Sequence, residues 1–164
     1  MKSKLLIWCL ALWGVVGFTG CDDNDDVTNL PEVIENAFND KFPDATWVEW
    51  ERKAGYYVAE FRQDGMDVEA WYDNQGSWRM TESDFGRNLT LLPQAVQTTF
   101  QSSGYSQWTV DDIDKYECPD KTFYLIEVKK AGQRDRKLFY SQDGLLLKDV
   151  EDKENDDVLP TISF

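Results

Sequence analysis

The most constraining feature of the chain is a tandem repeat. The segment Leu30–Phe38, LPEVIENAF, returns 62 positions later as Leu92–Phe100, LPQAVQTTF. Two later segments recur in the same order, YYVAEF as FYLIEV and WYDNQG as FYSQDG, at offsets of 67 and 68. A repeat of this length is one supersecondary unit used more than once, and stacked units bury apolar surface against each other. The chain is therefore expected to fold as two related halves, with most recurring residues in structural roles.

Each half is predicted to begin with an amphipathic helix. Apolar residues at spacings of three and four form one helical stripe, and in the first half they are Leu30, Val33, Ile34, Ala37, Phe38 and Phe42. Pro31 stands near the start of this helix, where a missing N–H is harmless, and Pro43 ends it. The second half has a thinner stripe, made of Leu92, Val96 and Phe100.

Four strands are predicted after each helix, because short segments rich in aromatic and β-branched residues are separated by short connectors, most of which contain Gly. The expected strands are 46–52, 56–62, 67–72 and 77–81, then 107–115, 122–130, 134–141 and 145–149. Short connectors imply antiparallel neighbours. We therefore expect an α+β fold of two tandem helix-plus-antiparallel-sheet repeats. Its parts are repeats over 30–82 and 91–150, a linker over 83–90, and an acidic C-terminal tail with an apolar end over 151–164.

One face of each sheet is expected to pack on its helix. Side chains alternate along a strand, which assigns to the helix side Tyr57, Ala59, Phe61, Val68, Ala70 and Tyr72. The opposite face then carries Tyr56, Glu60, Glu69 and Trp71, with Trp47 or Trp50 as a neighbour. Exposed aromatic and acidic side chains are typical of a recognition surface, so these four are candidate binding residues. The alternative is that the aromatic residues simply suit a pleated sheet.

The N-terminus has the pattern of a secretory signal peptide over residues 1–20, with two lysines, an apolar run, and small and polar residues after it. Phe18-Thr19-Gly20-Cys21 resembles a lipobox, although Phe18 stands where Leu is usual. We therefore predict that Cys21 is lipidated and that 21–29 is an acidic tether. Acidic residues directly after such a cysteine resemble a surface-export signal, which favours an outer membrane lipoprotein on the cell surface or the periplasmic side. The alternative is an ordinary signal peptide with a chance cysteine.

The charge of the chain limits its partners. Cleavage before Cys21 removes Lys2 and Lys4 and no acidic residue, which takes the net charge from −14 to about −16. Nucleic acid is excluded as a partner because phosphate backbones need a basic footprint. Anionic lipid is excluded as an electrostatic partner for the same reason, so membrane contact is expected only through the lipid at Cys21. A basic protein or peptide surface remains compatible with this charge.

The residues give little support for catalysis. The chain has no histidine, which removes histidine-dependent triads and the common zinc motifs. Cys118 then lacks a histidine to activate it, and with Cys9 in the signal and Cys21 acylated it has no disulfide partner. The acidic runs at Asp22–Asp26 and Asp111–Asp114 lack the spacing and central Gly of an EF-hand. We therefore expect no catalytic residue, no metal and no cofactor.

The motifs of the first half carry a resemblance to a known family. They are Leu30-Pro31, Phe42-Pro43-Asp44-Ala45, Trp47, Trp50, Tyr57, Glu60-Phe61, Asp64-Gly65, Trp71-Tyr72-Asp73 and Gly76. In these positions the chain resembles the PepSY-like family of secreted bacterial proteins, whose fold is similar to that of the beta-lactamase-inhibitor protein. The second half lacks the Phe-Pro-x-Ala element and has Ser102-Ser103-Gly104-Tyr105 instead. The resemblance implies that the two sheets join into one larger sheet, with a binding or peptidase-restraining role and no catalytic motif.

Together these features predict a non-catalytic envelope lipoprotein that binds a protein or peptide partner through a sheet surface, as an inhibitor-like or regulatory module. The alternative is a carboxylate-dependent hydrolase that acts on an envelope glycan in a cleft between the repeats. Two acidic side chains facing each other across a concave aromatic cleft would favour the hydrolase. A broad sheet surface without such a pair would favour the binding protein.

Overall fold

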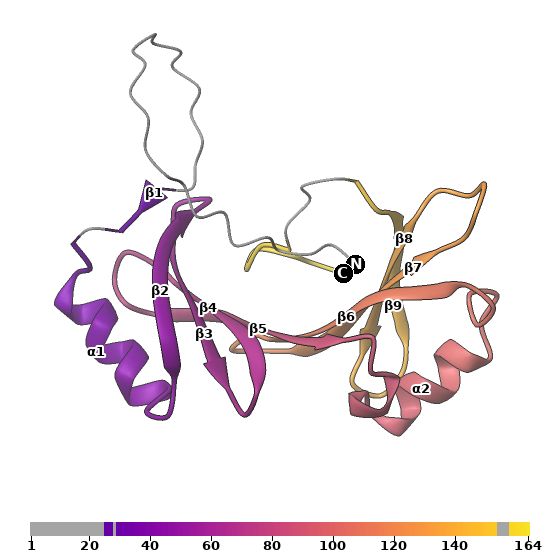
Figure 1. Cartoon of the computed structure of the whole chain (residues 1–164), viewed down its shortest axis with the longest axis horizontal. Coiled ribbons are helices and arrows are strands. Elements are labelled where there is room, and N and C mark those ends of the chain that lie inside the picture. The colour runs from indigo at the N-terminus through magenta and orange to yellow at the C-terminus, as the bar shows by residue number, and fades with distance from the viewer. Residues whose placement is uncertain (1–24, 28, 154–157) are drawn as a thin grey trace, which may run out of the picture.

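A computed structural model describes residues 25–27, 29–153 and 158–164. All of its strands form one antiparallel sheet, in which the spatial order of the strands is their order along the chain. The elements are β1 (Asp25–Asp26), α1 (Glu32–Lys41), β2 (Thr46–Lys53), β3 (Tyr56–Gln63), β4 (Met66–Tyr72), β5 (Trp78–Gly86), the 3₁₀ helix η1 (Leu89–Leu91), α2 (Gln94–Gln101), β6 (Thr109–Glu117), β7 (Thr122–Lys129), β8 (Arg136–Ser141) and β9 (Leu146–Glu151). The prediction of an α+β fold with one joined antiparallel sheet and two α-helices is confirmed (Figure 1).

Two differences from the sequence prediction change how the chain divides into repeats, linker and tether. β5 continues to Gly86, so the first part of the expected linker is strand. The reason is pairing: Ser83 lies opposite Lys115 and Asp84 lies opposite Asp114 on β6, and this ladder joins the two halves of the sheet. In the expected tether, Asp25–Asp26 forms β1 and pairs with the edge of β2.

Helix α1 covers the predicted face of β3 and β4. Ile34 and Phe38 are buried on the helix and pack against Ala59, Phe61, Val68, Ala70 and Tyr72. All six residues assigned to the helix side belong to this core, with Tyr57 partly buried at its margin. Val33 is an exception to the predicted stripe, because it is 52% exposed. Trp50 also lies on this side, with its ring 5.2 Å from that of Phe38.

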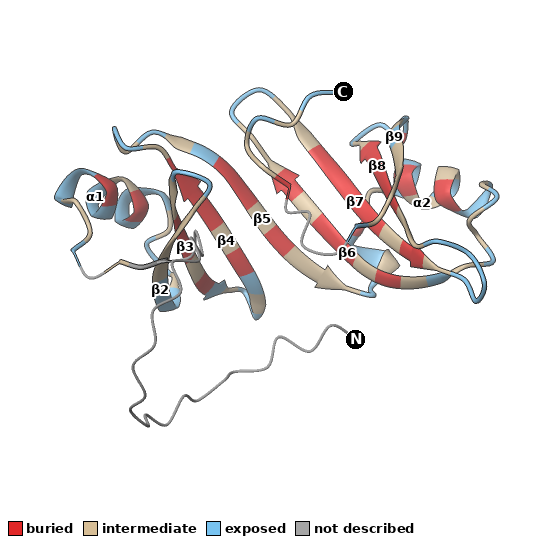
Figure 2. Ribbon diagram, turned by 90° about the horizontal axis from the view of Figure 1, so that it is seen from above, coloured by how far each residue is buried: buried red, intermediate tan, exposed pale blue. Residues whose placement is uncertain are grey.

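Helix α2 covers the same face of the sheet at its other end. Leu92, Val96 and Phe100 are buried, as the thinner stripe predicts. They pack on a cluster from β6, β7 and β8, formed by Ile113, Tyr124, Ile126, Val128, Leu138 and Tyr140. Figure 2 shows the buried residues concentrated along the strands and on the sides of both helices that face the sheet.

A turn glycine lies close to each helix. A Cβ at Gly76 would stand 3.0 Å from the carbonyl oxygen of Val33, and one at Gly144 would stand 2.6 Å from that of Ala95. Both glycines have a φ of +80° or more, which L side chains rarely adopt. The glycines that end WYDNQG and FYSQDG thus let a turn touch the backbone of the helix above it.

The helix-free face has its own apolar cluster, part of which comes from the C-terminus. Val58, Trp71, Met80, Tyr116, Phe123, Leu125 and Phe139 pack together with Val158. The ring of Phe164 lies 5.0 Å from that of Phe123 and 5.6 Å from that of Phe139. The apolar end of the chain therefore covers a core.

Several sequence predictions concern residues that the structure does not describe. The signal peptide over 1–20, the lipidated Cys21 and most of the acidic run that follows lie outside the described residues, as does 154–157. Within the described part of the chain, neither α-helix has the length and apolar character needed to cross a membrane.

Candidate binding surface

A row of carboxylates crosses the helix-free face of the sheet. Glu49 on β2 lies opposite Glu60 on β3, and Glu60 lies opposite Glu69 on β4. Glu69 in turn lies opposite Glu82 on β5. Like charges directly opposite each other on neighbouring strands destabilise a sheet. Three such pairs in succession therefore have a cost in stability that a bound positive charge would offset.

The row continues across the junction of the two halves. Asp84 on β5 lies opposite Asp114 on β6, and Asp112 lies opposite Glu127 on β7. At this end Glu127 forms an ion pair with Lys137, 3.6 Å away. We call the whole set the acidic band; it consists of Glu49, Glu60, Glu69, Glu82, Asp84, Asp112, Asp114 and Glu127.

Lys53 partly neutralises the β2–β4 end of the band. Its Nζ lies 3.3 Å from Glu60 Oε1 and 3.3 Å from Glu69 Oε2, and it also pairs with Glu51. Burial disfavours the charged form of Lys53, but the attraction of Glu69, Glu51 and Glu60 is stronger in sum and raises its pKa. The lysine therefore stays charged, and one cation serves three carboxylates.

An exposed tryptophan stands beside the band. Trp47 is 83% exposed and has a φ of +59°, a left-handed backbone conformation that is unusual for a bulky residue. It lies where the β2–β3 register shifts between Thr46 and Glu49. Such bulges re-aim side chains and are over-represented next to functional sites. The sheet therefore holds a large aromatic side chain in solvent at a cost of about 1–2 kcal/mol in backbone strain.

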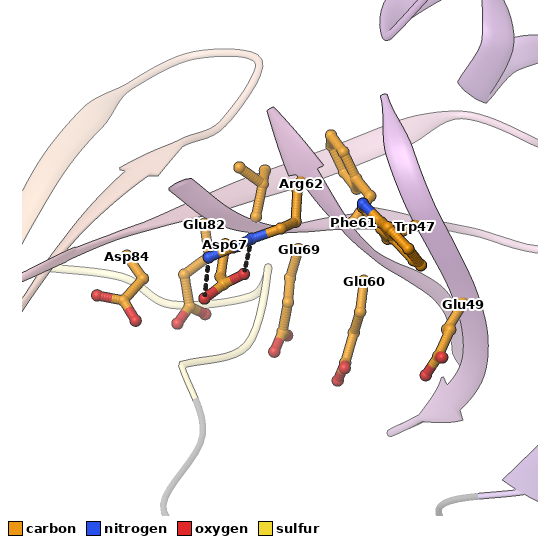
Figure 3. Close-up of a pocket in the computed structure, with 10 residues that line it drawn as sticks. Trp47, Glu49, Glu60, Phe61, Arg62, Asp67, Glu69, Glu82 and Asp84 are labelled. Carbon is orange, nitrogen blue, oxygen red and sulfur yellow. Dashed lines mark hydrogen bonds and ion pairs between the residues drawn. The ribbon is translucent and has the colours of Figure 1, made fainter. Parts of the chain in front are cut away.

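Trp47 and the band line one open groove of about 490 Å³, which we call the acidic groove. Its lining residues are Trp47, Glu49, Glu60, Phe61, Arg62, Asp67, Val68, Glu69, Glu82 and Asp84. Figure 3 shows Glu49, Glu60, Glu69, Glu82 and Asp84 projecting to one side, with Trp47 against Phe61. Arg62 is held by Asp67, with 2.8 Å between Nε and Oδ1.

The four predicted binding residues differ in their exposure to solvent. Glu60 and Glu69 line the acidic groove, and the side chain of Glu60 is 47% exposed. Tyr56 is half-buried, with its ring 6.0 Å from that of Trp71. Trp71 lies on the predicted face but is only 1% exposed, so its assignment to an exposed surface is wrong.

The burial of Trp71 has a cause that is distant in sequence. Its cluster includes Tyr116 and Phe123 from the second half and Val158 from the C-terminus. Trp47, which sequence reasoning named only as a neighbour, is the exposed aromatic residue of the groove. Trp47 is exposed because of the bulge in β2. A sequence pattern that assumes regular alternation of side chains does not reveal this bulge.

Comparisons with known proteins agree with this architecture. A family model described as "Putative beta-lactamase-inhibitor-like, PepSY-like" matches residues 23–68 and 55–148. A solved BLIP-like protein from Bacteroides fragilis NCTC 9343 is 35% identical, with 82% of this chain and 97% of that chain covered and a TM-score of 0.73. A DUF2874 family protein from Bacteroides ovatus ATCC 8483 is 30% identical, with 76% and 89% covered and a TM-score of 0.72.

A third solved structure is described as "putative periplasmic proteins" from Bacteroides eggerthii DSM 20697. It is 25% identical, with 75% of this chain and 89% of that chain covered and a TM-score of 0.70. A search of curated proteins gives no significant match. Since the family model spans most of the sequence and the solved structures share its fold, the chain belongs to the beta-lactamase-inhibitor-like, PepSY-like family.

Proposed function

We propose that this protein is a non-catalytic envelope lipoprotein, built from two tandem repeats, that binds a basic segment of a protein or peptide partner in the acidic groove. The observation that carries the proposal is the row of like-charge pairs from Glu49 to Glu82 beside an 83% exposed Trp47. The inhibitor-like character of the family and the BLIP-like fold support a binding role.

The chemistry of the groove suits lysine and arginine side chains. Each cation that enters would lie between carboxylates that now face one another, and it would relieve repulsion as well as form ion pairs. Trp47 offers an indole face for a cation–π contact, which is worth about 0.5–2 kcal/mol. Tryptophan is also among the residues that most often dominate binding energy at protein interfaces. Charge would give the interaction its specificity and its speed of association.

The location of the protein is part of the proposal. The signal-peptide pattern over 1–20 and the Gly20-Cys21 junction favour a lipidated protein of the outer membrane. A relative described as periplasmic supports an envelope location in general. A tethered module of this kind would meet its partner at the membrane surface, on the cell surface or the periplasmic side.

The hydrolase is the weaker candidate. Glycoside hydrolysis needs two carboxyl groups on either side of the scissile bond, about 5–10 Å apart. In the acidic groove Glu60, Glu69 and Glu82 stand on neighbouring strands of one sheet and project to the same side (Figure 3). These carboxylates lie on one surface and do not face each other across a cleft. This arrangement suits a peptide with several basic side chains better than a sugar that must be held between two carboxyl groups.

Binding of defined peptides tests the proposal. The probe is a lysine- and arginine-rich peptide, and the matched probe has each basic residue replaced by glutamine. We expect only the basic peptide to bind, with an affinity that falls as salt rises. Trp47→Ala, and separately Glu49→Gln combined with Glu60→Gln, should weaken binding about tenfold, a loss of about 1.4 kcal/mol.

The control variant is Glu35→Gln, which removes an exposed acidic residue from α1 on the opposite side of the sheet. It lowers the net negative charge without touching the groove, so peptide binding should be unchanged. Equal weakening by the control and the groove variants would mean that overall charge, and not the groove, attracts the peptide. That result would overturn the assignment of the groove.

A further inference from the structure

Three carboxylates of the acidic band converge where the two halves of the sheet meet. Asp84 on β5 and Asp112 and Asp114 on β6 each place a carboxylate oxygen within 4.8 Å of the other two. Two oxygens that share one Ca²⁺ ion, at bond lengths of 2.3–2.6 Å, are at most about 5 Å apart. The observed spread therefore allows one ion of this size to contact all three side chains.

The local backbone brings these side chains together. The β5–β6 register shifts between Asp84 and Gly86, and the β6–β7 register shifts between Val110 and Asp112. Backbone N–H groups hold one oxygen of two of the carboxylates: Gly86 donates to Asp84 and Ile113 donates to Asp112. Two bulges thus flank the cluster and orient carboxylates that a regular ladder would leave parallel.

The third carboxylate has no such support. Asp114 is 8% exposed, and within the described part of the chain it has neither a hydrogen-bond donor nor an ion-pair partner. A buried carboxylate without a partner is costly, and proteins normally pair such a group, protonate it or place it on a metal. Its carboxyl group lies among the oxygens of Asp84 and Asp112, which have the same charge.

Other acidic residues surround this cluster. Glu82 and Asp84 lie on β5, Asp112 lies beside Asp114 on β6, and Glu127 lies on β7 opposite Asp112. Negative charge is therefore concentrated around Asp114 from three neighbouring strands, which favours a cation there.

We propose that Asp84, Asp112 and Asp114 form a binding site for a divalent cation, with Ca²⁺ as the best fit. Carboxylate oxygens are the ligands that Ca²⁺ prefers, and water would complete its coordination. Mg²⁺ fits less well, because it demands near-ideal octahedral geometry and gives up its water reluctantly. The ion would bridge β5 and β6, the strands that join the two halves, and its binding does not depend on a peptide in the acidic groove.

Calorimetric titration and thermal unfolding of the mature protein at neutral pH test this site, with Ca²⁺ alone as the probe. We expect one Ca²⁺ to bind with a Kd on the order of 10⁻⁴–10⁻³ M, as in weak extracellular sites. Binding to the folded state only should raise Tm in Ca²⁺ relative to EDTA. Sodium chloride at matched ionic strength should give a smaller rise, because it screens charge without bridging the strands.

Substitution separates the site from general screening. Asp114→Asn should raise Tm in EDTA, because it removes a buried like charge, and should abolish the shift caused by Ca²⁺. Asp84→Asn, at a half-buried position, should likewise abolish the Tm shift caused by Ca²⁺. This second variant tests the site even if Asp114→Asn fails to fold. The control is Asp120→Asn in the exposed β6–β7 turn, which should respond to Ca²⁺ as the unaltered protein does. An undiminished Ca²⁺ response in both cluster variants, or equal effects of Ca²⁺ and matched sodium chloride, would overturn the proposal.

Discussion

Trp71 and Trp47 should respond to truncation in opposite ways. Trp71 is 1% exposed and packs with Val58 and Met80, whereas Trp47 is 83% exposed at the bulge in β2. Both side chains are the same size, so a comparison of Trp71→Ala with Trp47→Ala isolates the effect of burial.

The magnitudes follow from that exposure. Removing a buried Trp side chain costs about 3–5 kcal/mol, through lost transfer energy and the cavity left behind. Truncating an exposed side chain away from such features changes stability by about 0.5 kcal/mol or less. Ala keeps the strained backbone at position 47, so no large gain is expected there. Trp47→Gly should be more stable than Trp47→Ala by about 1 kcal/mol, because Gly adopts a φ of +59° without strain.

Urea unfolding followed by circular dichroism measures these differences, and peptide binding is measured on the same samples. We expect Trp71→Ala to lower the unfolding midpoint strongly while binding per folded molecule stays within about twofold of the unaltered protein. Trp47→Ala should do the reverse, with about tenfold weaker binding and little change in the midpoint. If Trp71→Ala is as stable as Trp47→Ala, Trp71 is not core and the packing of the helix-free face is wrong.

Three further predictions concern a turn glycine, the pH dependence of stability and the lipid anchor. Gly144→Ala should destabilise the fold more than Gly132→Ala, since both have a positive φ but only Gly144 lies against the backbone of α2; equal losses in urea unfolding would refute the close approach. The pKa of Asp112 is raised by burial from 3.8 to about 6, so its contribution to stability is present below pH 3.8 and is lost as the pH rises through about 6. Asp112→Asn should therefore flatten the fall in Tm over that interval, and an unchanged profile would contradict the shift. Cys21→Ser should release the protein from the membrane fraction, whereas a variant that remains bound would refute lipidation.

The face assignments from sequence succeed where the signal is local. Ala59 and Phe61 alternate with Val58 and Glu60 on one strand, and a period of two is enough to place them on opposite faces. The same rule placed Trp71 on the helix-free face correctly. It could not show that the face is covered there, because burial depends on groups from the far end of the chain.

The junction of the halves was harder to predict for a related reason. Glu82, Ser83 and Asp84 are polar and precede a Gly, which is typical of a linker, yet they form an internal strand. Glu82 and Asp84 are polar because they belong to the acidic band, and not because they lie in a solvent-exposed loop. The convergence of Asp84 with Asp112 and Asp114 also depends on two bulges and a cross-strand register, neither of which sequence spacing encodes.

The order of the strands in the sheet has a consequence for how the chain folds. Every strand pairs with its neighbour in sequence, so almost all pairings need only a short loop to close. There are two exceptions: α1 intervenes between β1 and β2, and η1 and α2 intervene between β5 and β6, which is the longer connection. Proteins dominated by local contacts fold fast, and closing the longest loop has the largest entropic cost. We therefore expect each half to form its own hairpins early, and the β5–β6 ladder to form last and set the folding rate.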